Sequence, residues 1–159
     1  MTRTAAPAGH GSGIRMDRVN HTLLPLWRRI YTEFTRRMEW SGLTPNAAFV
    51  LLELFVHPDR AEPSVLAEST CLPRQTMTFV IDQLEHKALL RRTPHPSDRR
   101  RRILQITPRG HRLARRIWDD VVRFESRGLA AVPPVQVSKI RIQLNHYADA
   151  LARQNAVKD

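Results

Sequence analysis

Residues 73–107, PRQTMTFVIDQLEHKALLRRTPHPSDRRRRILQIT, contain the pattern from which the fold of this 159-residue chain can be predicted. Apolar side chains recur at helical spacing over residues 73–87. Two short segments suited to extended strands, 88–93 and 101–107, then flank a polar tip at residues 94–98. The segment therefore predicts a helix followed by a β-hairpin with a long loop.

Further helices are predicted on both sides of this segment. Apolar residues from Val19 to Met38 recur in steps of three and four and indicate a long amphipathic helix, in which Pro25 either causes a kink or lies in the first turn. Thr44-Pro45 and Thr107-Pro108 each supply an N-cap followed by proline at the first helical position, so each predicts a helix start. A final stripe from Val137 to Leu151 predicts a C-terminal helix.

The full order is helix, helix, a short helix over residues 64–69, helix, hairpin, helix, helix. This order is typical of a winged helix-turn-helix, a mainly α (α+β) fold. The outer helices carry apolar stripes too long for one small lobe to cover, and pairing with a second copy would bury them. We expect a flexible tail at residues 1–13, a helical dimerisation region formed by residues 14–40 and 109–156, and a winged lobe at residues 41–108.

The charge of the chain is concentrated in one segment. The formal net charge is +11, and residues 87–116 contain eleven basic residues and one acid, Asp98, whereas the rest is close to neutral. Nucleic acid is therefore the preferred partner, with an anionic membrane surface as the competing interpretation. Cys71 is the single cysteine, which excludes an intrachain disulfide, and the first ten residues lack the apolar stretch of a secretory signal. A cytoplasmic protein is expected.

Several short motifs follow one another in a characteristic order. They are Leu43-Thr44, Leu66-Ala67, Thr76-x-Thr78, Leu84-Glu85, Leu89-Leu90-x-Arg92, Asp98-Arg99-Arg100 and Ile106-Thr107-x-x-Gly110. In this order the chain resembles the MarR family of dimeric bacterial transcription regulators, from about Leu23 to Arg116. The resemblance implies a ligand-responsive repressor that binds pseudo-palindromic double-stranded DNA as a homodimer.

The chain departs from that family at two positions. The helix before the wing usually ends in glycine, but this chain has Ala88, so either another residue forms the turn or the helix ends differently. The family often has a polar or small residue where this chain has Phe79.

The helix over residues 73–87 is expected to contact DNA. At 100° per residue, Met77, Val80, Ile81 and Leu84 form a buried stripe, and Gln75, Thr78, Phe79 and Asp82 lie opposite. Phe79 is either covered by a neighbouring element or contacts thymine methyl groups. Gln75 is suited to an adenine edge, Thr76 and Thr78 to phosphate or base, and Arg74 to phosphate or guanine.

The wing contains four consecutive arginines, whose side chains alternate between the two faces of a strand and so cannot all enter one groove. By the resemblance, Arg100 enters the minor groove and Asp98 orients it through a charge-assisted hydrogen bond. Phosphate contacts are expected from Lys87, Arg91 and Arg92, and Arg99 and Arg101 are further candidates for DNA binding.

The resemblance also implies a ligand pocket between the dimer helices and the winged lobe. Candidate residues for an aromatic or anionic effector are Trp27, Arg28, Tyr31, Phe49, His111 and Trp118. Aromatic residues at helical spacing more often belong to a core, which is the competing interpretation. A lone cysteine such as Cys71 is more often partly buried and inert than redox-active.

The histidines form no ligand pattern for a metal, and no nucleophile or phosphate-binding motif is present, so no cofactor, metal or catalytic residue is expected. The sequence predicts a homodimeric, sequence-specific transcriptional regulator, a repressor released by a small aromatic or anionic ligand. The alternative is an architectural or weakly specific DNA-binding protein without an effector.

Overall fold

The computed structural model describes residues 22–95, 98 and 101–156 of the chain. The chain divides between Phe34 and Thr35 into two compact units. The described part of the first unit consists of Thr22, Leu23 and most of α2 (Leu24–Met38), whose last four residues belong to the second unit. Pro25 lies in the first turn of this helix, so the second of the two expectations for this proline is confirmed.

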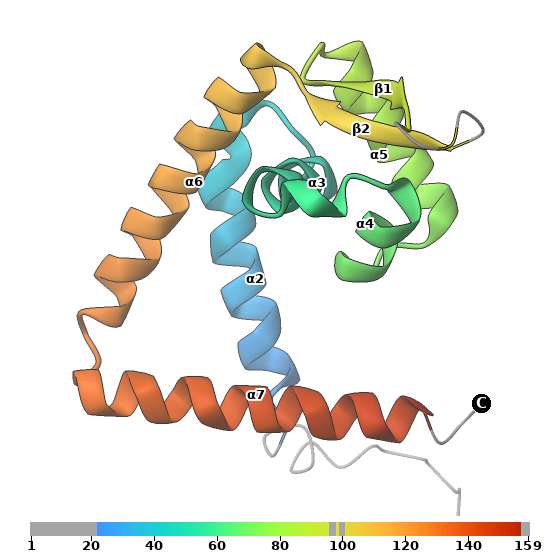
Figure 1. The fold of residues 1–159 in the computed structure, drawn as a ribbon. Coiled ribbons are helices and arrows are strands. Elements are labelled where there is room, and N and C mark those ends of the chain that lie inside the picture. The colour runs from blue at the N-terminus through green and yellow to red at the C-terminus, as the bar shows by residue number, and fades with distance from the viewer. Residues whose placement is uncertain (1–21, 96–97, 99–100, 157–159) are drawn as a thin grey trace, which may run out of the picture. The chain divides into compact units, whose positions relative to one another are not determined.

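The second unit carries the remaining elements in the predicted order (Figure 1). They are η1 (Glu39–Ser41), α3 (Pro45–Val56), η2 (Pro58–Arg60), α4 (Pro63–Ser69), α5 (Arg74–His86), β1 (Leu90–Pro94), β2 (Arg102–Ile106), α6 (Pro108–Leu129) and α7 (Pro134–Ala156). The mainly helical winged helix-turn-helix predicted from the sequence is therefore confirmed.

The two predicted threonine caps begin their helices as expected. The Ala47 amide donates to Thr44 Oγ1 at 3.4 Å, and the Gly110 amide donates to Thr107 Oγ1 at 3.0 Å. Each cap satisfies an amide that has no partner within its own helix, and the following proline supplies the helical φ.

The hairpin is antiparallel, with Leu90 opposite Ile106 and Arg92 opposite Leu104. The first strand begins at Leu90 and not at Ala88, because Ala88 has a positive φ of 55° and closes the end of α5. Ala88 therefore adopts the left-handed conformation itself, in place of the glycine usual in the family. Cys71 ends α4 with the same geometry at φ 54° and is exposed, so the expectation of a partly buried cysteine is wrong.

The core of the winged lobe lies between α3, α4, α5 and the hairpin (Figure 1). α3 is central because it packs against α4, α5 and α6. The largest fully buried side chains are Val50, Leu51, Leu66, Met77, Val80, Ile81, Leu84, Leu90 and Ile117. A second, smaller cluster joins Met38, Ala48, Leu52 and Ile117.

The C-terminal helix α7 differs from the other α-helices of this unit, because none of its residues is buried. Ile140, Leu144, Tyr147 and Leu151 are each about half exposed. Their spacing of four, three and four residues places these four side chains along one face. No helix in the described part of the chain is long and apolar enough to cross a bilayer.

The first turn of α6 contacts the turn after α5 too closely to allow a side chain at Gly110. A Cβ atom there would lie 1.9 Å from the Leu89 carbonyl oxygen and 2.9 Å from its carbonyl carbon. Both atoms belong to the backbone, so no side-chain movement can relieve the overlap.

We therefore expect Gly110→Ala to lower the free energy of unfolding by about 1–3 kcal/mol, measured by chemical denaturation. Gly128→Ala, in the same helix, is the matched control because nothing lies within 4 Å of its Cβ position. It should raise stability by up to about 1 kcal/mol through helix propensity alone. Equal effects of the two substitutions would contradict the close approach.

Candidate DNA-binding site

Helix α5 presents two chemically different faces. Met77, Val80, Ile81 and Leu84 are at most 2% exposed and pack into the core. Gln75, Thr78, Phe79 and Asp82 are exposed on the opposite side. The division predicted from helical periodicity is therefore confirmed, and the second helix of the helix-turn-helix keeps a mixed polar and apolar face free.

Phe79 is the largest apolar side chain on that free face. It is 62% exposed, so no neighbouring element of the second unit covers it. The expectation that a neighbouring element covers the ring is therefore not met, and its contact with thymine methyl groups stays a prediction.

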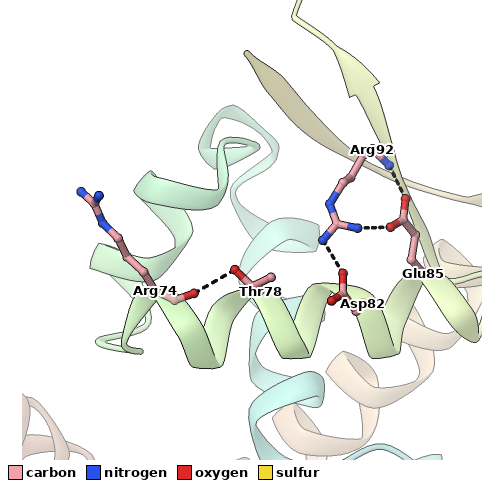
Figure 2. Close-up of polar contacts among 5 residues, drawn as sticks. All are labelled: Arg74, Thr78, Asp82, Glu85 and Arg92. Atoms are coloured by element: carbon pink, nitrogen blue, oxygen red, sulfur yellow. Dashed lines mark hydrogen bonds and ion pairs between the residues drawn. The ribbon is translucent and has the colours of Figure 1, made fainter. Parts of the chain in front are cut away.

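Near the start of α5, the Thr78 hydroxyl donates to the Arg74 carbonyl oxygen at 3.1 Å (Figure 2). A hydroxyl has a single hydrogen, so Thr78 keeps only its acceptor lone pairs and its methyl group for a partner. The Arg74 guanidinium extends away from the other residues drawn in Figure 2. Thr76 is half-buried and less accessible than Gln75 or Thr78.

Arg92 on β1 is held by two carboxylates of α5 (Figure 2). Its guanidinium donates to Asp82 Oδ1 at 2.5 Å and forms an ion pair with Glu85. The hydrogen bond with Asp82 is the largest influence on this group and raises the pKa of the Arg92 guanidinium above its ordinary value. Its contact with phosphate stays a prediction, because the side chain already has partners within the protein.

Other basic residues of the wing also have partners within the protein. Arg91 donates from Nε to Gln105 Oε1 at 2.9 Å, and Arg101 forms an ion pair with Glu62. Lys87 is exposed at the end of α5. Asp98 is half-buried, and its carbonyl oxygen accepts from the Arg101 amide at 3.0 Å. Arg99 and Arg100 lie outside the described residues, and with them the predicted pairing of Asp98 with Arg100.

The predicted effector residues fall in both units. Trp27, Arg28 and Tyr31 are exposed on α2, in the first unit. In the second unit Phe49 packs against the smaller core cluster, and Trp118 is 39% exposed. The His111 ring lies edge-on to Phe55, with centroids 5.9 Å apart. The pocket that would combine these residues stays a prediction.

Sequence reasoning missed a polar cluster around Asp120 on α6. Its carboxylate accepts from the Arg37 guanidinium and from Trp40 Nε1 at 3.2 Å, and the Arg37 contact lowers the pKa of Asp120 below its ordinary value. The cluster borders a hollow of about 320 Å³. No local pattern predicts a contact between residues 83 positions apart. Within the described residues, no group of three His, Cys, Asp or Glu side chains is placed to hold a metal ion.

The free face of α5 beside a basic hairpin defines a winged helix-turn-helix protein. Residues 43–101 match the model of the MarR family. The chain is 33% identical over 94 residues to the HTH-type transcriptional regulator MhqR of Bacillus subtilis and 34% identical over 95 residues to the HTH-type transcriptional repressor MdtR of the same organism. These matches cover 59% and 60% of this chain but only 64% and 61% of the relatives.

Solved structures extend the likeness beyond the lobe. The transcriptional repressor CouR, bound to a 23-mer DNA duplex, is similar with a TM-score of 0.74 and 26% identity over 86% of this chain and 99% of CouR. The S. aureus MepR–DNA complex is similar in fold, with a TM-score of 0.73 and 19% identity over 81% of this chain and 98% of MepR.

We expect Phe79→Ala to change the free energy of unfolding by less than about 0.5 kcal/mol, because the ring lies outside the core. Leu84→Ala, on the buried face of the same helix, should cost about 2–5 kcal/mol by removing core contacts. Thermal or chemical denaturation of both variants gives the comparison. A large loss of stability in Phe79→Ala would place the ring in a packed interface of the folded protein.

Proposed function

We propose that the chain is a homodimeric, sequence-specific DNA-binding transcriptional regulator of the MarR type, a repressor released by a small aromatic or anionic ligand. The observation that carries this proposal is the free face of α5, on which amide, hydroxyl and aromatic groups lie opposite a fully buried stripe. A protein that only coats the DNA backbone needs cations and no such mixed face.

In this proposal α5 enters the major groove of double-stranded DNA. Gln75 suits a bidentate contact with adenine, and Phe79 suits the methyl group of thymine. Arg74 and Lys87 supply phosphate contacts, together with the basic wing. The net charge of +10 over residues 87–116 favours association with a polyanion. Because its proposed partner is DNA, the protein is proposed to be cytoplasmic.

The proposed dimer forms through residues 14–40 and 109–156, and residues 41–108 form the DNA-binding lobe. The support is the exposed apolar face of α7, together with Leu24, Leu26, Trp27 and Ile30, which are all exposed on α2. Exposed apolar faces on helices are typical of protein–protein interfaces. A second copy is the occupant that a two-fold operator requires.

The effector is proposed to be a small aromatic or anionic molecule, and its candidate aromatic contacts are Trp27, Tyr31 and Trp118. Aromatic rings supply stacking surface, and Arg28 or His111 is available to hydrogen-bond an anion. Phe49 completes the proposed set.

Selection of bound duplexes from a random DNA pool by the full chain tests the central proposal. We expect an inverted repeat of about 16–20 bp, because two-fold related helices contact half-sites about one helical turn apart. Gln75→Ala should relax the sequence preference at one position in each half-site, costing about 1–3 kcal/mol of discrimination. Lys87→Ala, the control, should weaken binding to all sequences and lower the magnitude of the salt slope by about 1. Failure to enrich any sequence would leave the architectural protein as the better description.

The dimer is tested by light scattering, which should give twice the chain mass of 18.4 kDa. Ile140→Asp combined with Leu144→Asp should dissociate the dimer, because it places charge on the apolar face of α7. Asn145→Asp adds a charge to the other side of the same helix and should leave the mass unchanged. A wild-type chain that stays monomeric while it binds its operator tightly would contradict the proposal.

A further inference from the structure

Arg92 lies in the middle of β1, and its side chain points to the same side of the strand as Leu90. Leu90 is 1% exposed and belongs to the core. Alternate residues of a strand share a face, so Arg92 points toward α5, whereas Arg91 points to the other face and contacts Gln105 of β2. The strand geometry thus separates two neighbouring arginines into different environments.

Glu85 contacts Arg92 in two ways. One carboxylate oxygen accepts from the Arg92 backbone amide at 2.9 Å, and the other pairs with the guanidinium (Figure 2). Because Glu85 binds both the backbone and the side chain of Arg92, it restricts the position of β1 and the rotamer of Arg92. Asp82, one turn earlier on α5, holds the other end of the guanidinium.

The charges of this cluster do not suit a simple phosphate-binding role. One cation faces two anions, so the three side chains together carry a net charge of about −1 at neutral pH. Asp82 is on the exposed face of α5, one turn after Thr78, and its negative charge there would repel a DNA phosphate. The two acids therefore act on the protein itself, because they hold the Arg92 side chain and the strand β1.

We infer that Arg92 is a positioning residue, which fixes the wing against the recognition helix α5 through Asp82 and Glu85 and does not act as a phosphate contact. This inference rests on the proposed DNA-binding function. Both α5 and the wing must contact the same duplex. If their relative position is fixed before binding, the protein loses less conformational entropy when it binds DNA, so binding is more favourable.

The test compares affinities of four full-length proteins for the duplex that wild type enriches from a random pool. They are the wild type, Asp82→Ala/Glu85→Ala, Arg92→Ala and the triple variant. Removal of the two acids should weaken binding about tenfold, although it removes two negative charges beside a polyanion. Arg92→Ala should weaken wild type by a similar factor and have little further effect once the acids are gone.

A phosphate contact gives the opposite results. Removal of the acids would then strengthen binding, and Arg92→Ala would cost the same in both backgrounds. Glu68→Ala, which removes an exposed acid of α4, is the control for charge alone and should leave affinity unchanged or slightly higher. If Glu68→Ala weakens binding as much as the loss of Asp82 and Glu85, the inference is wrong.

Two conservative variants separate positioning from a general loss of structure. Asp82→Glu keeps a carboxylate within reach of Arg92 and should retain affinity within about threefold. Arg92→Lys keeps the charge that a phosphate needs but cannot bond both carboxylates as a planar fork, so it should bind nearly as weakly as Arg92→Ala. Arg92→Lys with wild-type affinity would overturn the inference.

Thermal unfolding shows whether each variant is folded at the assay temperature. If an alanine variant is not folded, the affinities of Asp82→Glu and Arg92→Lys decide whether Arg92 is a positioning residue. A wild-type chain that binds no DNA would overturn the proposed function itself. A wild-type chain that binds DNA, with tighter binding after loss of the acids, would overturn only the role of Arg92.

Discussion

The close contact between the first turn of α6 and the turn that follows α5 is the constraint on which the winged lobe depends. The Leu89 carbonyl oxygen accepts from the Thr107 amide at 3.0 Å, and the Thr107 hydroxyl donates to the Ala88 carbonyl oxygen at 2.8 Å. Gly110 makes this approach sterically allowed. One small contact thereby determines where α5 ends, where the hairpin begins and closes, and where the long helix α6 starts.

A second set of contacts between the hairpin and α5 lies next to this one. The Arg92 bonds to Asp82 and Glu85 connect the middle of β1 to α5, whereas the Thr107 contact holds the base of the hairpin. Because these two contacts lie at different positions along β1, they restrict both the translation and the tilt of the hairpin relative to α5. The surface that would face DNA is therefore built from two elements whose spacing the protein sets by itself.

The basic residues of this surface fall into two groups, those that have a partner within the protein and those that are exposed. Arg91, Arg92 and Arg101 each have a partner in the protein, whereas Arg74 and Lys87 are exposed. Charged groups that already hold a partner contribute less to counterion release than free ones, so the number of basic residues overstates the number of phosphate contacts. The concentration of charge in residues 87–116 serves the architecture of the wing as well as its attraction to a polyanion.

The sequence by itself determined the element order, the two threonine caps and the division of α5 into a buried and a free face. These features depend on local periodicity and on backbone chemistry within a few residues, which a single chain displays directly. Only the tertiary structure decided that Ala88 takes the left-handed position, that Gly110 faces the Leu89 carbonyl group, and that Arg92 binds Asp82 and Glu85. Arg37 and Asp120 likewise meet across 83 positions of sequence. The physical reason is that the partner of a charged or closely packed group is selected by distance in the folded chain, and a sequence pattern records the face on which a residue lies but not the neighbour that faces it.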